Sequence, residues 1–345
     1  QQGTGVAGVL IGDPCMLGGS WIGYITCEYG RQFDTYHRTV DLLNAFVPDR
    51  STDFWGILGD NFYDRIGHIT ADVFSRISLE AKSKFFVTVP GNHDFWIFGS
   101  PKVSTTRDQC GHAFMQFYAQ DAKAAEAAVA GSNLAPFNYT VDPSAASTMG
   151  YGCSIPELSN MFWYNQIGNV GLVGQSGAHS LEESRPFMAE ACQWLAEQPG
   201  LQVAVLLGHW DKSNLGVESE MDMPAWYHEM ALLPGCAEFN QRGMLKYVMG
   251  HTHCNEPHPH GDVGTGFRVG AFGMEGCGNY GVPVIDTTES RVRFWYFDTS
   301  SDDLYKVVMG CVGQQGWRQC LHLAESWLDQ PIVHSPSEPF VEVVI

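Results

Sequence analysis

The feature that most constrains this 345-residue chain is an apolar run that ends in a carboxylate and a phenol. Residues 54–58 read Phe-Trp-Gly-Ile-Leu, and residues 59–63 read Gly-Asp-Asn-Phe-Tyr. An apolar run of this length, closed by glycine, is typical of a buried strand. Asp60 and Tyr63 then lie at the carboxyl end of that strand, where they can face a cleft. A Gly-Asp turn alone is common, so the segment gains meaning only from similar segments elsewhere.

Four other apolar runs also end in side chains that can bind metals. Helical patterns at 31–47 and 72–82 separate the first three runs, and this alternation predicts parallel strands. Ligands of open α/β sheets bind beyond the carboxyl ends of the strands, so these side chains are expected at one edge. The runs at 6–11, 85–89, 203–207 and 244–249 are followed by Asp13, by Asn92 and His93, by His209, and by His251 and His253.

Each of these residues has an ordinary structural interpretation when taken alone. Asp13 and Asn92 are common turn residues, and a lone His209 is more often a hydrogen-bonded structural histidine. His251 and His253 after a buried strand are harder to explain, because two buried imidazoles need partners. Together the residues predict two cations about 3.5–4 Å apart that share one carboxylate. Imidazole, carboxylate, amide and phenolate ligands favour iron, zinc or manganese.

The remaining chain is expected to complete a single domain spanning residues 1–345. Residues 97–160 are interpreted as an insertion with a helix at 118–130, since the segment is too short for a core of its own. A hairpin is predicted around Gly168 and Asn169, and a helix at 182–198. Residues 291–297 and 304–309 are predicted to form a C-terminal β-hairpin, followed by a tail to residue 345.

Charge argues against nucleic acid as a partner. The chain carries 19 Lys and Arg against 38 Asp and Glu, a formal charge of −19. Binding to a phosphate backbone needs a basic stripe, which this sequence lacks. An anionic substrate must therefore be attracted locally, for example by bound cations. No apolar run approaches the roughly 20 residues that span a bilayer, so we expect no membrane span and a soluble protein.

Several weak signals favour a secreted, extracellular or lumenal (including vacuolar) glycoprotein. The sequence begins at Gln1, which suits a mature chain after removal of a targeting segment. Asn138 begins an N-glycosylation sequon, and the ten cysteines are even in number. Disulfides are predicted between Cys311 and Cys320 and between Cys110 and Cys153.

In their residues and their order, the four motifs at 59–63, 91–94, 208–209 and 250–253 resemble those of the calcineurin-like metallophosphoesterases. The phenol of Tyr63 makes the chain resemble the purple acid phosphatases of the small, tartrate-resistant type. The resemblance spans roughly residues 6–310. It implies an α/β fold of the metallophosphoesterase type, a four-layer double β-sandwich of mixed sheets flanked by helices. It further implies ferric iron bound by Asp13, Tyr63 and His253, and divalent iron, zinc or manganese bound by Asn92, His209 and His251, with Asp60 bridging the two ions.

The sequence also departs from the family pattern. The wider family has a histidine ligand at the position of Cys15, so a thiolate ligand is conceivable there. Where the family usually places another histidine near the substrate, this chain has Glu218, with His228 only later. His258 and His260 are interpreted as residues of a solvated loop.

The expected function is a secreted binuclear metallohydrolase, an acid phosphatase that cleaves small phosphate monoesters. A metal-bound hydroxide would attack phosphorus, and His93 would stabilise the transition state or protonate the leaving alcohol. One alternative is a phosphodiesterase or nucleotide hydrolase that uses the same metals. Another is a non-catalytic surface or assembly protein that retains the metal fold for stability.

Overall fold

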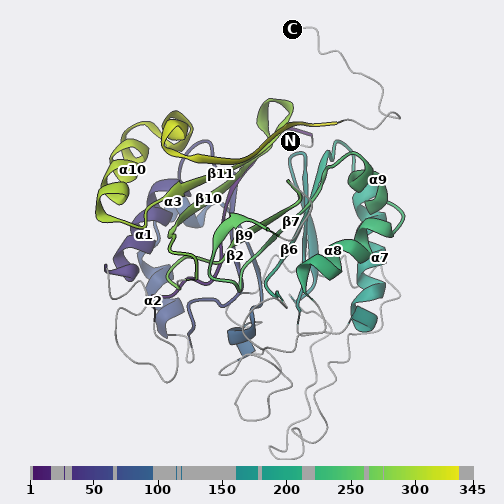
Figure 1. The fold of residues 1–345 in the computed structure, drawn as a ribbon, viewed down its shortest axis with the longest axis horizontal. Helices are drawn as coiled ribbons and strands as arrows, with labels where there is room; N and C mark the ends of the chain where they lie inside the picture. Colours follow the sequence, from purple (N-terminus) through teal and green to yellow (C-terminus); the bar gives the residue numbers. More distant parts are fainter. Residues whose placement is uncertain are drawn as a thin grey trace, which may run out of the picture.

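The chain folds into two six-stranded mixed sheets that pack face to face, with helices on both outer sides (Figure 1). The computed structural model describes residues 3–16, 27, 33–64, 68–95, 114, 118, 161–177, 181–211, 222–259, 264–274 and 276–333.

The first sheet has the strand order β12-β11-β10-β1-β2-β3. Its strands β1, β2 and β3 run parallel, whereas β10, β11 and β12 pair antiparallel with their neighbours. The strands are β1 (Ala7–Ile11), β2 (Phe54–Leu58), β3 (Phe85–Val89), β10 (Gly281–Asp286), β11 (Arg291–Asp298) and β12 (Glu325–Pro331).

The second sheet has the order β4-β5-β6-β7-β9-β8, with β5, β6, β7 and β9 parallel. The edge strands β4 and β8 pair antiparallel with β5 and β9. The strands are β4 (Trp163–Ile167), β5 (Val170–Gly174), β6 (Val203–Gly208), β7 (Leu245–Met249), β8 (Asn255–Pro257) and β9 (Gly266–Val269).

Helices cover the outer face of each sheet. In Figure 1, α1 (Thr35–Phe46), α2 (His68–Arg76), α3 (Leu79–Lys82) and α10 (Asp302–Gln315) lie beside the first sheet. On the opposite side, α7 (Leu181–Glu197), α8 (Met223–Leu232) and α9 (Cys236–Gln241) lie beside the second sheet. Among the described residues, the short 3-10 helices η2 (Asn92–Phe95), η3 (Thr288–Ser290) and η4 (Trp317–Leu323) follow strands or α10.

Strand β2 shows how the sequence produces four layers. Successive side chains of a strand point to opposite faces of the sheet. Phe54 and Leu58 pack in the core between the sheets, while Trp55 and Ile57 pack in the core beneath the helices of the first sheet. All four are buried, as expected of a strand covered on both faces. The predicted four-layer α/β fold is therefore confirmed.

Two local predictions were wrong. Residues 304–309 belong to helix α10, not to a strand, because Ser301 caps the helix by accepting a hydrogen bond from the backbone N–H of Leu304. Strand β11 instead pairs with β10 and β12. The predicted helix 72–82 is interrupted at Ser78, whose hydroxyl caps a new helix, α3. The predicted helix 118–130, nearly all of the insertion at 97–160, and the sequon at Asn138 lie outside the described residues.

Four disulfides join described cysteines, and one of them is the predicted bond between Cys311 and Cys320. The predicted bond between Cys110 and Cys153 lies outside the described residues. The other three are Cys15–Cys27, Cys192–Cys236 and Cys254–Cys277. This density of disulfides is typical of proteins that fold in an oxidising compartment. In the described part of the chain, no helix has both the length and the apolar character needed to span a bilayer.

Candidate metal centre

The carboxyl ends of β1, β2, β3, β6 and β7 bring the predicted ligands together where the two sheets meet. Because parallel strands start at one side and end at the other, the loops that follow them share one edge. The structure brings together all seven residues predicted as ligands and His93 beside them, although they come from segments up to about 240 positions apart. The seven are Asp13, Asp60, Tyr63, Asn92, His209, His251 and His253.

Asp13, Tyr63 and His253 form a first set of three. The Tyr63 hydroxyl donates a hydrogen bond to Oδ1 of Asp13 at 2.9 Å and lies 3.2 Å from Nε2 of His253. Nε2 of His253 lies 3.5 Å from the same Oδ1. A phenol oxygen, a carboxylate oxygen and an imidazole nitrogen therefore converge on one point.

Asn92, His209 and His251 form a second set of three. Oδ1 of Asn92 lies 2.9 Å from Nε2 of His209 and 3.0 Å from Nδ1 of His251. The two ring nitrogens are 3.3 Å apart. Nδ1 of His209 faces the carbonyl oxygen of Leu58 at 2.8 Å, so Nδ1 carries the proton and Nε2 is left with a lone pair in the neutral ring. A hydrogen bond of this kind to a backbone carbonyl commonly orients metal-binding histidines.

Asp60 lies between the two sets. Its Oδ1 is 3.4 Å from Nε2 of His209, and its negative charge helps to raise the pKa of the Tyr63 phenol in the first set. Oxygen and nitrogen atoms of Asp13, Asp60 and His209 all lie within 4.8 Å of one another. One carboxylate therefore reaches both sets of three.

These separations fit the ligand shell of a metal ion. Two ligand atoms that each lie about 2.1 Å from one cation, with a ligand–metal–ligand angle of about 90–109°, are about 3.0–3.4 Å apart. The spacings within the two sets of three, 2.9–3.5 Å, lie within about 0.1 Å of this range. In addition, the carboxylates of Asp13 and Asp60 are at most 1% exposed. Buried charges of this kind are what bound cations compensate.

Five of these seven residues have left-handed backbone conformations. The φ angles of Asp13, Asp60, Tyr63, His251 and His253 lie between 50° and 72°. Non-glycine residues seldom adopt these angles, and clusters of such strain are typical of functional sites. The strain is retained because the surrounding contacts hold each side chain toward the centre.

Two glycines make room for this close approach. A Cβ atom on Gly91 would lie 2.1 Å from the backbone nitrogen of Asp60. A Cβ atom on Gly250 would lie 2.7 Å from both Oδ2 of Asp13 and Nδ1 of His209. Any larger residue at either position would push a candidate ligand out of place.

Burial and neighbouring charges shift the pKa values of the site. Burial alone would raise the pKa of Asp60, but the imidazoles of His209 and His93 hold it well below its ordinary value. Burial opposes a charge on His209 too, yet the carboxylates of Asp60 and Asp13 raise its pKa to about 9. Burial lowers the pKa of His251 to about 4 and keeps that ring neutral. Burial and the nearby carboxylates raise the pKa of the Tyr63 phenol well above its usual value, so ionising this phenol requires a cation.

His93 lies at the rim of the centre. Its backbone N–H donates to Oδ1 of Asp60 at 2.7 Å, and its Nε2 lies 3.9 Å from Oδ2 of Asp60. Its ring centroid is 5.0 Å from that of Tyr63, and its side chain is 24% exposed. Burial lowers the pKa of this imidazole. A partly exposed ring beside the centre can reach a bound molecule.

Sequence reasoning missed a buried pair that supports the loops. Asp94 accepts hydrogen bonds from the backbone N–H groups of Asn61 and Gly91 and from Nδ2 of Asn61, at 2.6–3.0 Å. The Asn61 side chain in turn accepts from the Thr88 hydroxyl on β3. The two loops that carry Asp60 and Asn92 are thus tied together. Asn61 and Asp94 belong to the motifs at 59–63 and 91–94, so the sequence does contain them as candidates. The sequence pattern gave a role only to the ligand residues beside them.

The structure places three of the residues that were named where the sequence departs from the family pattern. Cys15 is in a disulfide with Cys27, so it offers no thiolate to a metal. His258 is buried with its Nδ1 2.6 Å from the Tyr247 hydroxyl, so its placement in a solvated loop was wrong. His228 is exposed on α8. Glu218 and His260 lie outside the described residues.

A model of the calcineurin-like phosphoesterase family matches residues 9–255, which include all the residues of this centre. Among solved structures, a dimetal phosphatase from Danio rerio is 14% identical, with a TM-score of 0.42, and the match covers 86% of this chain and 96% of that one. A single mutant of Vps29 from Entamoeba histolytica is 11% identical, with a TM-score of 0.35, over 95% of this chain and 100% of that one. No curated protein matches the chain.

Proposed function

Because this chain belongs to the calcineurin-like phosphoesterase family, we propose that it is a binuclear metallohydrolase that cleaves small phosphate monoesters. The observation that carries the proposal is the arrangement of two sets of three ligand atoms with Asp60 between them. A phosphoryl group is the substrate for which paired cations are best suited, since two ions can hold its attacking and leaving oxygens.

The proposed metal ligands divide by set. Asp13, Tyr63 and His253 hold one ion, Asn92, His209 and His251 hold the other, and Asp60 bridges them. When bound, the cations supply charge neutralisation at the phosphoryl oxygens and acidify water. The protein residues position these ions and exclude competing ligands from a buried site.

His93 is proposed as the catalytic residue. Its partly exposed ring stands beside Asp60, where it can hydrogen-bond to a substrate oxygen and move a proton to the leaving alcohol. The backbone hydrogen bond from His93 to Asp60 fixes this placement relative to the bridging carboxylate.

The Tyr63 phenol supports a ferric ion in the first set, as in the purple acid phosphatases. A phenolate is a hard anionic ligand, and its buried hydroxyl already lies at the first set of three. The second ion is proposed to be divalent iron, zinc or manganese, because imidazole and amide ligands suit these metals.

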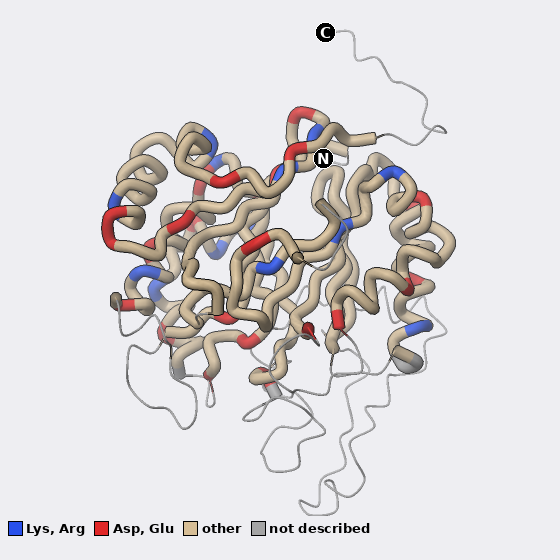
Figure 2. The backbone as a smooth tube through the Cα atoms, in the orientation of Figure 1, with Lys and Arg blue, Asp and Glu red and all other residues tan. Residues whose placement is uncertain are grey.

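A small anionic substrate, and not a nucleic acid, suits the charge of the molecule. In Figure 2 the Lys and Arg residues of the described chain lie scattered among more numerous acidic residues. Such a surface repels a polyanion, whereas the cations of the centre attract a single phosphate locally. Secretion is proposed on the strength of the four disulfides.

The proposal is tested by metal analysis together with turnover of an aryl phosphate monoester and a matched aryl diester. We expect about two metal ions per chain and faster turnover of the monoester. Faster turnover of the diester would favour the phosphodiesterase or nucleotide hydrolase that the same centre could support. A protein that binds two metals but turns over neither ester would be a non-catalytic protein that the metals stabilise. A protein that binds no metal would refute the metal centre itself.

A further inference from the structure

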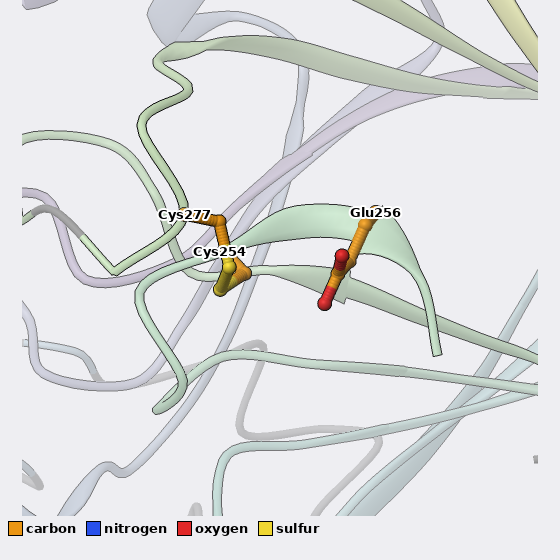
Figure 3. A group of neighbouring side chains, drawn as sticks. All are labelled: Cys254, Glu256 and Cys277. Atoms are coloured by element: carbon orange, nitrogen blue, oxygen red, sulfur yellow. A yellow bond between two sulfur atoms is a disulfide. The ribbon is translucent and has the colours of Figure 1, made fainter. Parts of the chain in front are cut away.

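A second group of metal-ligand side chains lies next to the centre, at the start of strand β8 and in the loop after β9. Cys254 immediately follows the proposed ligand His253 and precedes strand β8, on which Glu256 lies. Figure 3 shows the Glu256 carboxylate directed toward the disulfide between Cys254 and Cys277. One atom of each of the three side chains lies within 4.8 Å of the others.

This disulfide is more accessible than the others in the described part of the chain. Cys277 is exposed, whereas Cys254 is 4% exposed. Cys15, Cys27, Cys192 and Cys236 are at most 1% exposed, and in the remaining pair Cys320 is fully buried while Cys311 is partly buried. Thiol–disulfide exchange requires an attacking thiolate to reach a sulfur atom, so exchange should begin at Cys277.

We propose that reduction of the Cys254–Cys277 disulfide creates a binding site for a soft divalent cation such as zinc, formed by the two thiolates and Glu256. Two thiolates and one carboxylate are a suitable ligand set for zinc, with water able to fill a fourth position. The site is separate from the proposed catalytic pair, and it goes beyond the proposed function.

The chemistry balances with a small-molecule thiol as the reductant. Two thiol molecules reduce the protein disulfide to two cysteine thiols and are themselves oxidised to one disulfide. The cation then displaces both thiol protons to the solvent and binds two thiolates. After removal of the cation, exchange with the small-molecule disulfide restores the protein disulfide and returns two small-molecule thiols.

The loop around Cys277 has room for this change. Two sulfurs bound to one zinc ion at about 2.3 Å are roughly 3.8 Å apart, so the reduced sulfurs must separate further than in a disulfide. On one side of Cys277, Gly276 is held by a 2.8 Å hydrogen bond from its N–H to the carbonyl of His253. On the other side, a Cβ atom added to Gly278 would meet no heavy atom of the described residues within 4 Å. Cys277 can therefore move outward while the His253 side stays anchored.

Arg268 favours the carboxylate as the third ligand. Its Nη1 donates to Oε1 of Glu256 at 3.0 Å, which orients the carboxylate and leaves Oε2 for a cation. Arg268 also pairs with Asp211 at 2.8 Å, so with the cation bound the charges of two thiolates, Glu256, Asp211, Arg268 and a divalent ion sum to −1, which still favours a bound cation. The pairing is only partly buried, since the Glu256 side chain is 34% exposed, so an ion can enter from solvent.

The test uses the metal-loaded protein and Cd²⁺ as a probe, because thiolate-to-cadmium charge transfer gives an ultraviolet band that oxygen ligands do not. After mild thiol treatment and removal of the reductant under anaerobic conditions, alkylation and peptide mapping should find Cys254 and Cys277 as the first free thiols. The reduced protein should bind one more equivalent of Cd²⁺ than the oxidised protein and show the band.

Variants test whether these side chains form the site, and they are compared by their affinity for Cd²⁺ and not by enzymatic activity. Cys277→Ser should bind the additional Cd²⁺ at least about 100-fold more weakly, and Glu256→Gln about 10-fold more weakly. The double variant Cys311→Ala/Cys320→Ala lacks a different disulfide and should keep the additional equivalent. The proposal is overturned if the reduced wild-type protein binds no additional Cd²⁺, if Cys277→Ser or Glu256→Gln binds it as tightly as the wild type, or if other disulfides are reduced first.

Discussion

The backbone N–H of His93 donates a 2.7 Å hydrogen bond to Oδ1 of Asp60, the carboxylate that lies between the two sets of three ligand atoms. Oδ1 of Asp60, in the loop after β2, therefore contacts both the backbone of the loop after β3 and, at 3.4 Å, Nε2 of His209. A change at Asp60 should affect both the proposed metal pair and the placement of His93.

Asp60→Asn should lower the affinity for both metals by more than about 100-fold and abolish turnover. An amide cannot supply the negative charge that two cations share, and loss of a direct ligand should exceed the 10–100-fold effect typical of a supporting residue. Metal content after dialysis and monoester turnover measure the effect. Asp53→Asn is the matched control, because Asp53 precedes the same strand at its opposite end and binds the Ala7 N–H. An Asp60→Asn protein that keeps two metals and wild-type turnover would contradict the bridging role.

Tyr63→Phe should remove or strongly shift the visible absorption of the iron-loaded protein. The substitution deletes the oxygen that contacts Asp13 and His253 and keeps the ring that packs beside His93. Charge transfer to ferric iron requires this phenolate, and zinc or manganese alone gives no such band. Tyr280→Phe is a suitable control, since this buried phenol instead bonds with Thr39. An unchanged spectrum in iron-loaded Tyr63→Phe would remove the basis for a purple-type centre.

Removing the metals should destabilise the fold. Without cations, the buried carboxylates of Asp13 and Asp60 lie close together, and among the described residues only histidines supply positive charge beside them. A ligand present at 100 times its Kd stabilises the folded state by about 2.7 kcal/mol, which for a chain of this length corresponds to a fall of about 4 °C in Tm on its removal. Calorimetry before and after chelation measures this. Re-addition of metal should restore Tm in the wild type but not in Asp60→Asn, and an unchanged Tm after complete chelation would argue against a bound metal pair.

The convergence of the candidate ligands could be expected from the sequence because each of them follows closely after a strand. Runs such as 54–58 predict a buried strand from composition alone, and the parallel strands β2 and β3 deliver Asp60 and Asn92 to the same edge of one sheet. The positive φ angles of Asp13 and His251 could not be predicted from the sequence, because neither residue is a glycine or an asparagine, the residue types that most often adopt such angles. They arise from long-range contacts, such as the hydrogen bond from the N–H of His251 to Oδ2 of Asp13.

The C-terminal region was less predictable for a different reason. Residues 304–309 contain apolar side chains that suit either a strand or a helix, and such short runs are ambiguous. The deciding signal is local, namely Ser301 followed by Asp302 and Asp303 in the first turn, which favours a helix start. His258 illustrates the opposite case, in which the local sequence suggests a solvated loop but a long-range contact decides the outcome. Its side chain is buried against Tyr247 on strand β7.

Lys246 should make the stability of the protein depend on pH in the alkaline range. This lysine lies on β7, is 2% exposed, and donates from Nζ to the carbonyl of Gly264 at 2.6 Å. Burial lowers its pKa to about 8, against about 10.5 in the unfolded chain. The unfolded state therefore binds more protons between these values, so this group destabilises the fold at neutral pH and does so less as the pH rises.

The free energy of unfolding of the wild type, relative to that of Lys246→Met, should increase by about 2 kcal/mol between pH 7 and pH 9.5. Comparing the two proteins cancels the contributions of the other titrating groups, which both share. Denaturant unfolding at several pH values measures the difference. Lys306→Met, which removes an exposed lysine on α10, is the matched control and should show no such trend, because its ammonium group stays in water. A flat difference for Lys246→Met over this range, or one that favours the variant as the pH rises, would show that the buried ammonium keeps its ordinary affinity for protons.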